Sequence, residues 1–379
     1  MSENEVIVDG EVVHCIGCGA KVQTNDKNAL GYTPQSALEK GLKSGEVYCQ
    51  RCFRLRHYNE IAPVSLSDDD FLKLLTSISE TDSLIVYVID IFDVNGSLIP
   101  GLHRFVGHNP VLLVGNKMDV LPASIKKTKV RDWLRQRANA AGIRPVDVEL
   151  ISAKTNFDVD RLLDQIEKYR HGKDVYVVGV TNVGKSTLIN SVIRRSTGIK
   201  ELITTSRFPG TTLDRIDIPL DDGHSIVDTP GIIQPEQMAH HLVGKELNLV
   251  TPQKTIKPKV YQLNPEQTLF FGGVARFDYE TGDRKHGFTV YAENNLYIHR
   301  TKLINADAFY DKQLGHLLTP PSDESRVADF PALERHEFKT TQKSDVVIEG
   351  LGWVTVPSGV VVSGWAPKGV SVLIRPAMI

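Results

Sequence analysis

Short apolar runs alternate with segments of helical character through the middle of the chain. Residues 84–89, 111–114 and 174–178 are rich in branched and aromatic side chains, which suits buried strands. Residues 124–140 and 158–169 lie between or after such runs and are expected to be helices. Strands that alternate with helices predict a mostly parallel α/β sheet.

From about residue 250 the pattern changes to short alternating runs separated by turn residues, which is typical of a small β-rich domain. Residues 234–242, just before it, are expected to be helical. Residues 322–343 are charged and contain proline, so we expect a connector that can hold a short helix. The expected strands cover residues 260–263, 268–274, 288–290, 296–299, 346–348, 353–356, 360–363 and 370–374.

Aromatic residues recur in the β-rich region. Exposed aromatics beside basic residues on a sheet can stack on unpaired bases, whereas most aromatics in sheets form core, and both interpretations stay open. The candidates are Phe270, Phe271, Phe277, Tyr279, Phe288 and Tyr291.

The overall charge gives no support for nucleic-acid binding as a global property. The 379 residues suffice for two or three domains, and the formal net charge is only −2. Any RNA-binding surface must therefore be a local patch. Basic residues surround the helix expected at 124–140, which suits either RNA contact or an ordinary solvated face; they are Lys126, Lys127, Lys129, Arg131, Arg135 and Arg137.

The chain shows no sign of membrane association. No apolar run approaches the length of a membrane span, and the acidic N-terminus lacks a signal-peptide pattern. We therefore expect a cytoplasmic protein with no membrane partner.

All four cysteines lie in the first unit of the chain, residues 1–60, as C-I-G-C and C-Q-R-C. Two C-x-x-C pairs present four thiolates, a set that suits tetrahedral Zn²⁺. Disulfides and a redox-active pair are the alternatives, but a cytoplasmic location and the lack of a thioredoxin-like context argue against them. The expected zinc ligands are Cys15, Cys18, Cys49 and Cys52.

Residues 179–187 read GVTNVGKST and contain the phosphate-loop pattern G-x-x-x-x-G-K-[S/T]. The loop follows one expected strand and precedes an apolar run that can continue as a helix, which is the context that such a loop requires. Gly179 and Gly184 let backbone N–H groups point at phosphate oxygens. Lys185 can reach the β- and γ-phosphates, and Ser186 can hold Mg²⁺.

Four further stretches resemble motifs of GTPases. Residues 116–119 read N-K-M-D, like the guanine-specificity motif N-K-x-D, in which the carboxylate accepts hydrogen bonds from guanine. Residues 152–154 read S-A-K, like the second base-contact loop. Residues 228–231 read D-T-P-G, like the Mg²⁺ and γ-phosphate sensor, and residues 209–212 read P-G-T-T, like the effector loop.

The order of these motifs differs from that of a conventional GTPase, because N-K-x-D and S-A-K precede the phosphate loop. This order, with the cysteine pairs, resembles the bacterial YqeH-type GTPases of ribosome assembly. The resemblance implies an α/β fold with a circularly permuted P-loop GTPase domain at residues 61–240. It further implies an N-terminal four-cysteine zinc module at residues 1–60 and a C-terminal β-rich domain at residues 241–379 that contacts RNA or the ribosome.

The resemblance also implies the reaction, which is hydrolysis of GTP to GDP and phosphate with Mg²⁺. Lys185, Asn182, Thr212 and Asp228 would be catalytic, and Ser186, Thr212 and Asp228 would organise Mg²⁺, Asp228 through water. The implied GTP-binding residues are Asn116, Lys117, Asp119, Ser152, Ala153, Lys154, Asn182, Val183, Gly184, Lys185, Ser186, Thr187, Thr211, Thr212, Asp228 and Gly231.

Many GTPases place a water-orienting glutamine directly after the D-x-x-G motif, where this chain has Ile232. An alkyl side chain cannot orient water by hydrogen bonding, so intrinsic turnover is expected to be slow. In GTPases that resemble this one, an asparagine at the position of Asn182 helps to coordinate K⁺. The resemblance therefore suggests K⁺ as an additional cofactor.

The resemblance implies the small ribosomal subunit as the partner, through rRNA or ribosomal proteins. A GTP-dependent RNA-modification enzyme and a protein-only signalling switch are the alternatives. Because the D-T-P-G motif ends the GTPase domain, its switch segment runs directly into the β-rich domain, and we expect the two to be coupled. The sequence carries no indication of an oligomeric state.

Overall fold

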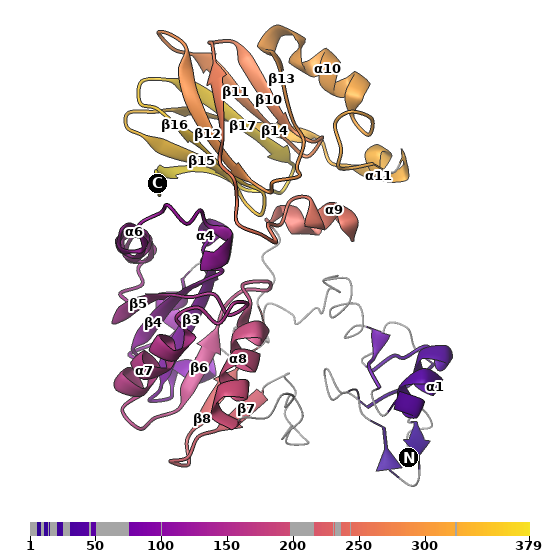
Figure 1. Cartoon of the computed structure of the whole chain (residues 1–379), viewed down its shortest axis with the longest axis vertical. Helices are drawn as coiled ribbons and strands as arrows, with labels where there is room; N and C mark the ends of the chain where they lie inside the picture. The colour runs from indigo at the N-terminus through magenta and orange to yellow at the C-terminus, as the bar shows by residue number, and fades with distance from the viewer. Residues whose placement is uncertain are drawn as a thin grey trace.

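The computed structural model describes three regions, at residues 6–50, 76–250 and 251–379, with gaps (Figure 1). The described residues are 6–8, 11–13, 15, 21–25, 31–44, 47–50, 76–99, 101–197, 216–229, 231, 236–242, 244–322 and 324–379.

A six-stranded sheet forms the core of the middle region, in the order β5-β4-β3-β6-β8-β7. All neighbours in it are parallel except β7 and β8. The central strands are near-continuous apolar runs because helices cover both of their faces. The strands are β3 (Leu84–Asp90), β4 (Val111–Asn116), β5 (Asp147–Leu150), β6 (Val175–Val178), β7 (Ile216–Pro219) and β8 (Ser225–Asp228).

The helices of this region follow the strands, as the alternating pattern predicts. α7 packs against both β3 and α8, and α6 packs against β5. The apolar faces of these helices, including Trp133, Leu162 and Leu188, join the core of the sheet. The elements are α4 (Val94–Ser97), α5 (Leu102–Phe105), η1 (Met118–Val120), α6 (Lys127–Ala140), α7 (Val159–Arg170) and α8 (Lys185–Thr197).

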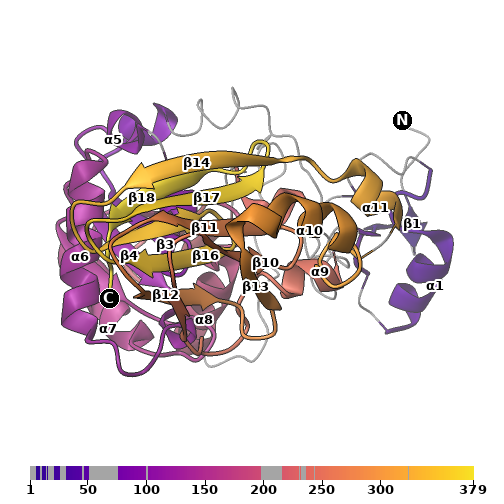
Figure 2. The same ribbon diagram turned by 90° about the horizontal axis from the view of Figure 1, so that it is seen from above.

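The C-terminal region is a sandwich of two antiparallel five-stranded sheets (Figure 2). One sheet has the order β13-β10-β11-β17-β14 and the other β18-β15-β16-β12-β9. The strands are β9 (Lys259–Leu263), β10 (Gln267–Phe271), β11 (Ala275–Thr281), β12 (His286–Ala292), β13 (Ile298–Lys302), β14 (Leu333–Lys339), β15 (Ser344–Ile348), β16 (Gly352–Val356), β17 (Val361–Pro367) and β18 (Val372–Pro376).

Short helices lie around the sandwich. α10 covers β10, where Phe309 and Tyr310 pack against the buried Phe270. The elements are η2 (Met238–His240), α9 (Lys245–Asn248), η3 (Leu303–Asn305), α10 (Ala306–Gln313) and α11 (Glu324–Asp329).

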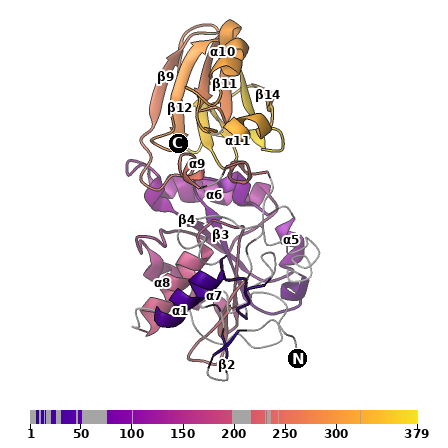
Figure 3. The same cartoon turned by 90° about the vertical axis from the view of Figure 1, so that its right-hand side faces the viewer.

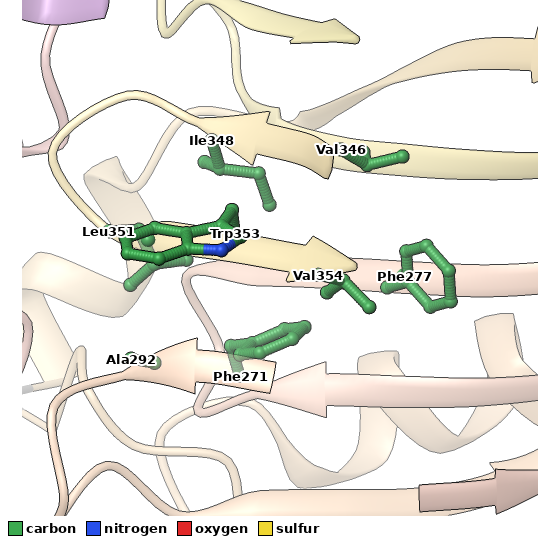
Figure 4. A pocket seen from close by; sticks show the side chains of 9 residues that line it. Phe271, Phe277, Ala292, Val346, Ile348, Leu351, Trp353 and Val354 are labelled. Atoms are coloured by element: carbon green, nitrogen blue, oxygen red, sulfur yellow. The ribbon is translucent and has the colours of Figure 1, made fainter. Parts of the chain in front are cut away.

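The aromatic residues considered for base stacking are core residues, so that interpretation is wrong. Phe270, Phe271, Phe277, Tyr279, Phe288 and Tyr291 are all at most 6% exposed. A small apolar pocket beside Phe271, Phe277 and Trp353 lies in the interior of the sandwich (Figure 4). All of the residues that line it are apolar.

Two further expectations need correction. Residues 322–343 hold not only the short helix α11 but also the strand β14, whose residues are all half-buried or exposed. β14 is an edge strand that is rich in charged residues. It contains no apolar run, so the sequence pattern did not predict it. In the helix expected at 234–242, the described residues form only the short turn η2, and residues 234–235 lie outside the description.

The sheet and the sandwich share a continuous buried core. Phe92, which follows β3, packs against Trp353 of β16, with ring centroids 5.6 Å apart. Trp133 of α6 donates its indole N–H to the carbonyl of Pro376, at 3.1 Å. Figure 3 shows α6 directly beneath the sandwich. The two domains are therefore docked through apolar burial as well as hydrogen bonds.

The N-terminal region contains the strands β1 (Ile7–Val8) and β2 (Glu11–Val12) and the helix α1 (Gln35–Ser44). Its small core includes Cys15, Val22, Leu38, Val47 and Cys49.

Candidate functional site

The phosphate loop connects β6 to α8, at the carboxyl edge of the parallel sheet. A Cβ on Gly179 would lie 2.5 Å from the carbonyl oxygen of Val88, and one on Gly184 would lie 2.5 Å from Asn116 Nδ2. Gly184 and Asn182 have φ values of 89° and 64°, in the left-handed region that glycine and asparagine tolerate best. The loop geometry thus depends on the two glycines that the motif specifies and on Asn182, which stands at a position that the motif leaves open.

Lys185 begins α8, and its side chain is buried opposite Asp228 at the end of β8. Burial lowers the pKa of Lys185, and the charge of Asp228 partly opposes that shift. Burial likewise raises the pKa of Asp228, opposed by Lys185. The two side chains therefore form a partly compensated pair beside the loop that the sequence motif predicts to bind phosphate.

Asp228 Oδ1 is buried and receives no hydrogen bond from any described residue. A buried carboxylate oxygen without a hydrogen-bond donor destabilises the folded state unless a cation or an ordered water binds to it. Asp228 therefore fits a role toward a hydrated Mg²⁺. Ser186 is exposed in the first turn of α8, directly after Lys185, and its hydroxyl could join the same ion. Thr211 and Thr212, the other predicted ligands, lie outside the described residues, as does Ile232.

The D-T-P-G segment contacts the phosphate loop directly. Thr229 donates from its hydroxyl to the carbonyl of Val177 at 2.8 Å. A Cβ on Gly231 would lie 3.1 Å from the Thr181 side chain and 3.3 Å from its backbone. Glycine at this position therefore lets the sensor segment approach the phosphate loop closely.

Asn116 ties three of the predicted motifs together. At the end of β4 its Nδ2 donates to the carbonyl of Val183 in the phosphate loop, at 2.8 Å. Its Oδ1 accepts from the N–H of Ala153 in the S-A-K loop, at 2.9 Å. The side chain is 2% exposed, so its two hydrogen bonds are shielded from water. They fix the position of the phosphate loop relative to the S-A-K loop.

Asp119 and Ser152, from the N-K-M-D and S-A-K stretches, lie side by side. Ser152 Oγ donates to Asp119 Oδ1 at 2.7 Å, which orients the carboxylate. Lys117 has a left-handed φ of 68° and pairs with Asp90 at 2.7 Å. Lys154 is exposed, and its Nζ donates to the carbonyl of Gln253 at 2.8 Å. The structure thus brings together the base loops that the motifs predict.

Sequence reasoning missed the segment that lies against these loops. Residues 253–256 run past both base loops on their way into the sandwich, and Thr255 donates to the carbonyl of Asp119 at 2.8 Å. The segment matches no nucleotide-binding motif, because its contacts use mostly backbone atoms.

The two cysteine pairs are partly described. Cys15 and Cys49, one from each pair, are both 2% exposed, and the N–H of Cys49 donates to Cys15 Sγ at 3.1 Å. A sulfur that accepts a backbone N–H suits a thiolate, and hence a metal ligand. Cys18 and Cys52 lie outside the description. Within the described ranges, no cluster of three or more His, Cys, Asp or Glu residues forms a metal site.

The basic helix α6 directs much of its charge toward its own domain. Arg131 pairs with Glu149 at 3.6 Å, and Arg135 pairs with Asp147 at 2.9 Å. Lys127 lies over the ring of Phe157, 3.6 Å from its centroid. These contacts favour the structural interpretation of the cluster over RNA contact.

Acidic groups are buried where the sandwich docks on the sheet. Gln237, a few residues after the D-T-P-G motif, donates to Asp93 Oδ2 at 3.0 Å and to the carbonyl of Gly96 at 2.8 Å. The next N–H, that of Met238, donates to the carbonyl of Glu349 in the sandwich, at 3.1 Å. Arg375 of β18 donates to Asn95 Oδ1 at 2.7 Å. Gln237 and Met238 therefore bond to both domains, Gln237 to the sheet domain and Met238 to the sandwich.

Stability of the docked domains is expected to fall as pH rises from about 4 to about 7. Burial, with the charge of Asp90, raises the pKa of Asp93 to about 6. Burial, with the charges of Asp93 and Glu236, raises the pKa of Glu349 to about 7. Between the ordinary and the raised pKa the docked state holds protons that an unfolded state releases. Its stability is therefore lost as pH rises through these values.

Thermal unfolding of the full chain across this range provides the measurement. The double variant Asp93→Asn, Glu349→Gln is expected to flatten the profile, whereas the exposed Asp164→Asn should leave its slope unchanged. An unchanged slope in the double variant would contradict the assignment of these two groups.

Comparisons with known proteins match the chain over nearly its full length. A family model described as "50S ribosome-binding GTPase" matches residues 174–268, and one described as "YqeH-like, C-terminal" matches residues 285–378. "Uncharacterized protein YqeH" of Bacillus subtilis (strain 168) is 54% identical over 371 residues, covering 97% of this chain and 100% of that protein. "NO-associated protein 1, chloroplastic/mitochondrial" of Arabidopsis thaliana is 30% identical, covering 92% of this chain and 70% of that protein.

More distant matches add little detail. "tRNA modification GTPase MnmE" of Anaplasma phagocytophilum (strain HZ) is 29% identical over 47% of this chain and 39% of its own length. A solved structure described as "GDP-bound structure of TM YlqF" is 20% identical, with a TM-score of 0.28, over 44% of this chain and 57% of that one. None of the described helices has the length and apolar character needed to cross a membrane.

Proposed function

Because this chain belongs to the YqeH family of GTP-binding proteins, we propose that it is a GTP-hydrolysing assembly factor for the small (30S) ribosomal subunit. The observation that carries the GTPase part is the set of contacts made by Asn116, which joins the phosphate loop to the S-A-K loop beside Asp119. The domain organisation proposed is a zinc module at residues 1–60, a circularly permuted GTPase domain at 61–240 and a C-terminal domain at 241–379.

The chemistry requires little beyond positioning and charge. Lys185 and the backbone N–H groups of the phosphate loop would neutralise charge that develops on the phosphates. Ser186 and Asp228, whose Oδ1 receives no hydrogen bond from the described residues, would hold Mg²⁺ and its water, and the ion would supply positive charge toward the phosphates. Asp119, oriented by Ser152, would select guanine.

K⁺ is a further proposed cofactor, supported by Asn182 in the phosphate loop. Asn182 is exposed and has a left-handed φ of 64°, so its side-chain oxygen is accessible to a cation from solvent. Phosphate release is then expected to be faster in potassium than in sodium salts, and equal rates would remove this part of the proposal alone.

Zinc is proposed for the N-terminal module, supported by the N–H···S contact between Cys49 and Cys15. Thiolates from both C-x-x-C pairs would complete a tetrahedral site that contributes to folding of the module. Elemental analysis should find one zinc per chain, and its loss in Cys49→Ser should leave GTP binding intact. Zinc-free protein, purified without chelator, would contradict the site.

The ribosomal part of the proposal is supported by the family and by the docked switch segment. Because Gln237 and Met238 bond to the two domains at once, rearrangement of the segment on loss of the γ-phosphate would change how the sandwich sits. We propose that this couples the nucleotide state to binding of rRNA or ribosomal proteins in the cytoplasm.

Co-sedimentation with isolated 30S and 50S subunits tests the proposal. Binding is expected to 30S subunits, with affinities that differ by about five- to 150-fold between GDP and a non-hydrolysable GTP analogue. Gln237→Ala should reduce that difference, whereas Gln313→Ala on α10 should not. Binding to 50S subunits alone, or equal binding with both nucleotides, would overturn the 30S assignment or the switch, respectively.

A further inference from the structure

Residues 253–256 form a strap across the guanine-recognition loops. Lys154 of the S-A-K loop donates to the carbonyl of Gln253 at 2.8 Å. Thr255 Oγ1 donates to the carbonyl of Asp119, and the N–H of Ile256 donates to the carbonyl of Val120, each at 2.8 Å. One short segment therefore bonds to both loops that face the base.

The strap is anchored in the core of the GTPase domain. Ile256 is 1% exposed and belongs to the same buried cluster as the sheet strands, although it lies far from them in sequence. A fully buried isoleucine fixes the position of the backbone on either side of it. The two strap bonds to η1 (Met118–Val120) are thus made from a rigid support.

The other side of the strap is bonded to the sandwich. Asn294, in the turn that follows β12, donates from Nδ2 to the carbonyl of Thr255 at 3.0 Å. Its Oδ1 accepts from the N–H of Lys257 at 2.8 Å, and its carbonyl accepts from Lys259 Nζ at 3.1 Å. The strap therefore lies between the guanine loops and a turn of the C-terminal domain.

Asp119 depends on this arrangement for its position. Its carboxylate is oriented by Ser152, but its backbone lies in the short turn η1, directly after Lys117, whose left-handed φ makes the turn intrinsically unfavourable. The strap bonds two consecutive carbonyls of that turn, those of Asp119 and Val120. Without them the turn would keep its connection to β4, the Ser152 contact and the bond from the N–H of Met118 to the carbonyl of Ile151 at 3.0 Å, which leaves the carbonyls of Asp119 and Val120 without these two bonds.

We infer that the strap is a third part of the guanine site, in which Thr255 and Ile256 position Asp119 and Asn294 makes this position depend on the C-terminal domain. The inference rests on the proposed guanine-nucleotide binding and adds a second connection between the domains, on the base side of the nucleotide and separate from the switch segment. Weakening the strap should reduce the part of the binding affinity that comes from the guanine base more than the part that comes from the phosphates.

The test compares GDP with inosine diphosphate, which lacks the 2-amino group of guanine, by calorimetric titration of the full-length protein. Ile256→Ala is expected to weaken GDP binding about tenfold and to reduce the preference for GDP over inosine diphosphate. Thr255→Val and Asn294→Ala should also reduce the GDP affinity and the preference for GDP over inosine diphosphate, by smaller factors. Thr255→Ser, which keeps the hydroxyl donor, and Ile256→Val should restore wild-type behaviour.

Ile143→Ala is the matched control. Ile143 is 2% exposed in the same core but precedes the amino end of β5, opposite the nucleotide edge. It should lower the melting temperature without changing the preference between the two nucleotides. If Ile256→Ala does not fold, the GDP affinity and base preference of Thr255→Val and Asn294→Ala test the inference instead.

Two results would overturn the inference, and they differ in whether the proposed function survives. Folded strap variants with wild-type GDP affinity and base preference would refute the strap and leave the proposed function intact. An unmodified protein that binds no GDP would refute the proposed function and the strap with it.

Discussion

Lys185→Ala is expected to weaken GTP binding by roughly 10- to 100-fold and to reduce hydrolysis below detection, since each hydrogen bond to a charged group contributes about 1.5–3 kcal/mol. Lys185 is the buried cation at the start of α8, and its charge faces Asp228. Its removal leaves the phosphate charge without its direct partner. It also leaves Asp228 buried with no opposing charge, so the pKa of Asp228 should rise further.

Lys173→Ala provides a matched control. Lys173 precedes β6 at the opposite end of the same strand, where it pairs with Asp82 at 2.6 Å on the surface. Exposed pairs of this kind contribute little to stability. GTP affinity measured by titration and phosphate release measured in the same buffer should both be unchanged in this variant. Retained hydrolysis in Lys185→Ala would contradict the role given to the phosphate loop.

Much of the nucleotide site could be predicted from the sequence because its parts are short and contiguous. The residues 179–187 and 116–119 each follow a buried parallel strand, and the carboxyl ends of such strands meet at one edge. Adjacent strands β4, β3 and β6 therefore bring the loops together without further information. The same holds for Asp228, since β8 is parallel to β6.

The parts of the site that the sequence did not predict are contacts between segments far apart in the chain, and no local sequence pattern indicates such contacts. The hydrogen bond from Asn116 to Val183 joins residues 67 positions apart, and Thr255 bonds to a carbonyl 136 positions away. The aromatic residues of the sandwich were ambiguous for a related reason. Phe277 of β11 and Phe288 of β12 are buried because their two sheets face each other, and both sheets are completed by strands much later in the chain, β14 and β17 in one and β15, β16 and β18 in the other.

The edge strand β14 illustrates a third limit. Its sequence LERHEFK has few apolar residues because one of its sides faces solvent, so neither length nor hydrophobicity marks it as a strand. It becomes recognisable only through its pairing with β17, from Leu333 with Pro367 to Lys339 with Val361.

Asp119→Asn is expected to weaken GTP binding roughly 10²- to 10⁴-fold and to give preference to XTP, because a site built to bond a base rejects one with the wrong donors. The Asp119 carboxylate can only accept, which matches the N1–H and 2-amino donors of guanine. In the variant, the amide oxygen can still accept from Ser152 Oγ, as Asp119 Oδ1 does at 2.7 Å. The amide NH₂ then faces the base and donates to the 2-oxo group of xanthine.

Competition binding with GTP, ATP and XTP, in the unmodified chain and in the variant, measures this change. Asp132→Asn, an exposed residue of α6, makes the same change in charge away from the site and should keep the preference for GTP. Hydrolysis of XTP by the variant at a rate near that of GTP by the unmodified chain would show that Lys185 and Asp228 are undisturbed. Equal affinity of the unmodified chain for ATP and GTP would remove the basis for the experiment, because Asp119 would then not select the base.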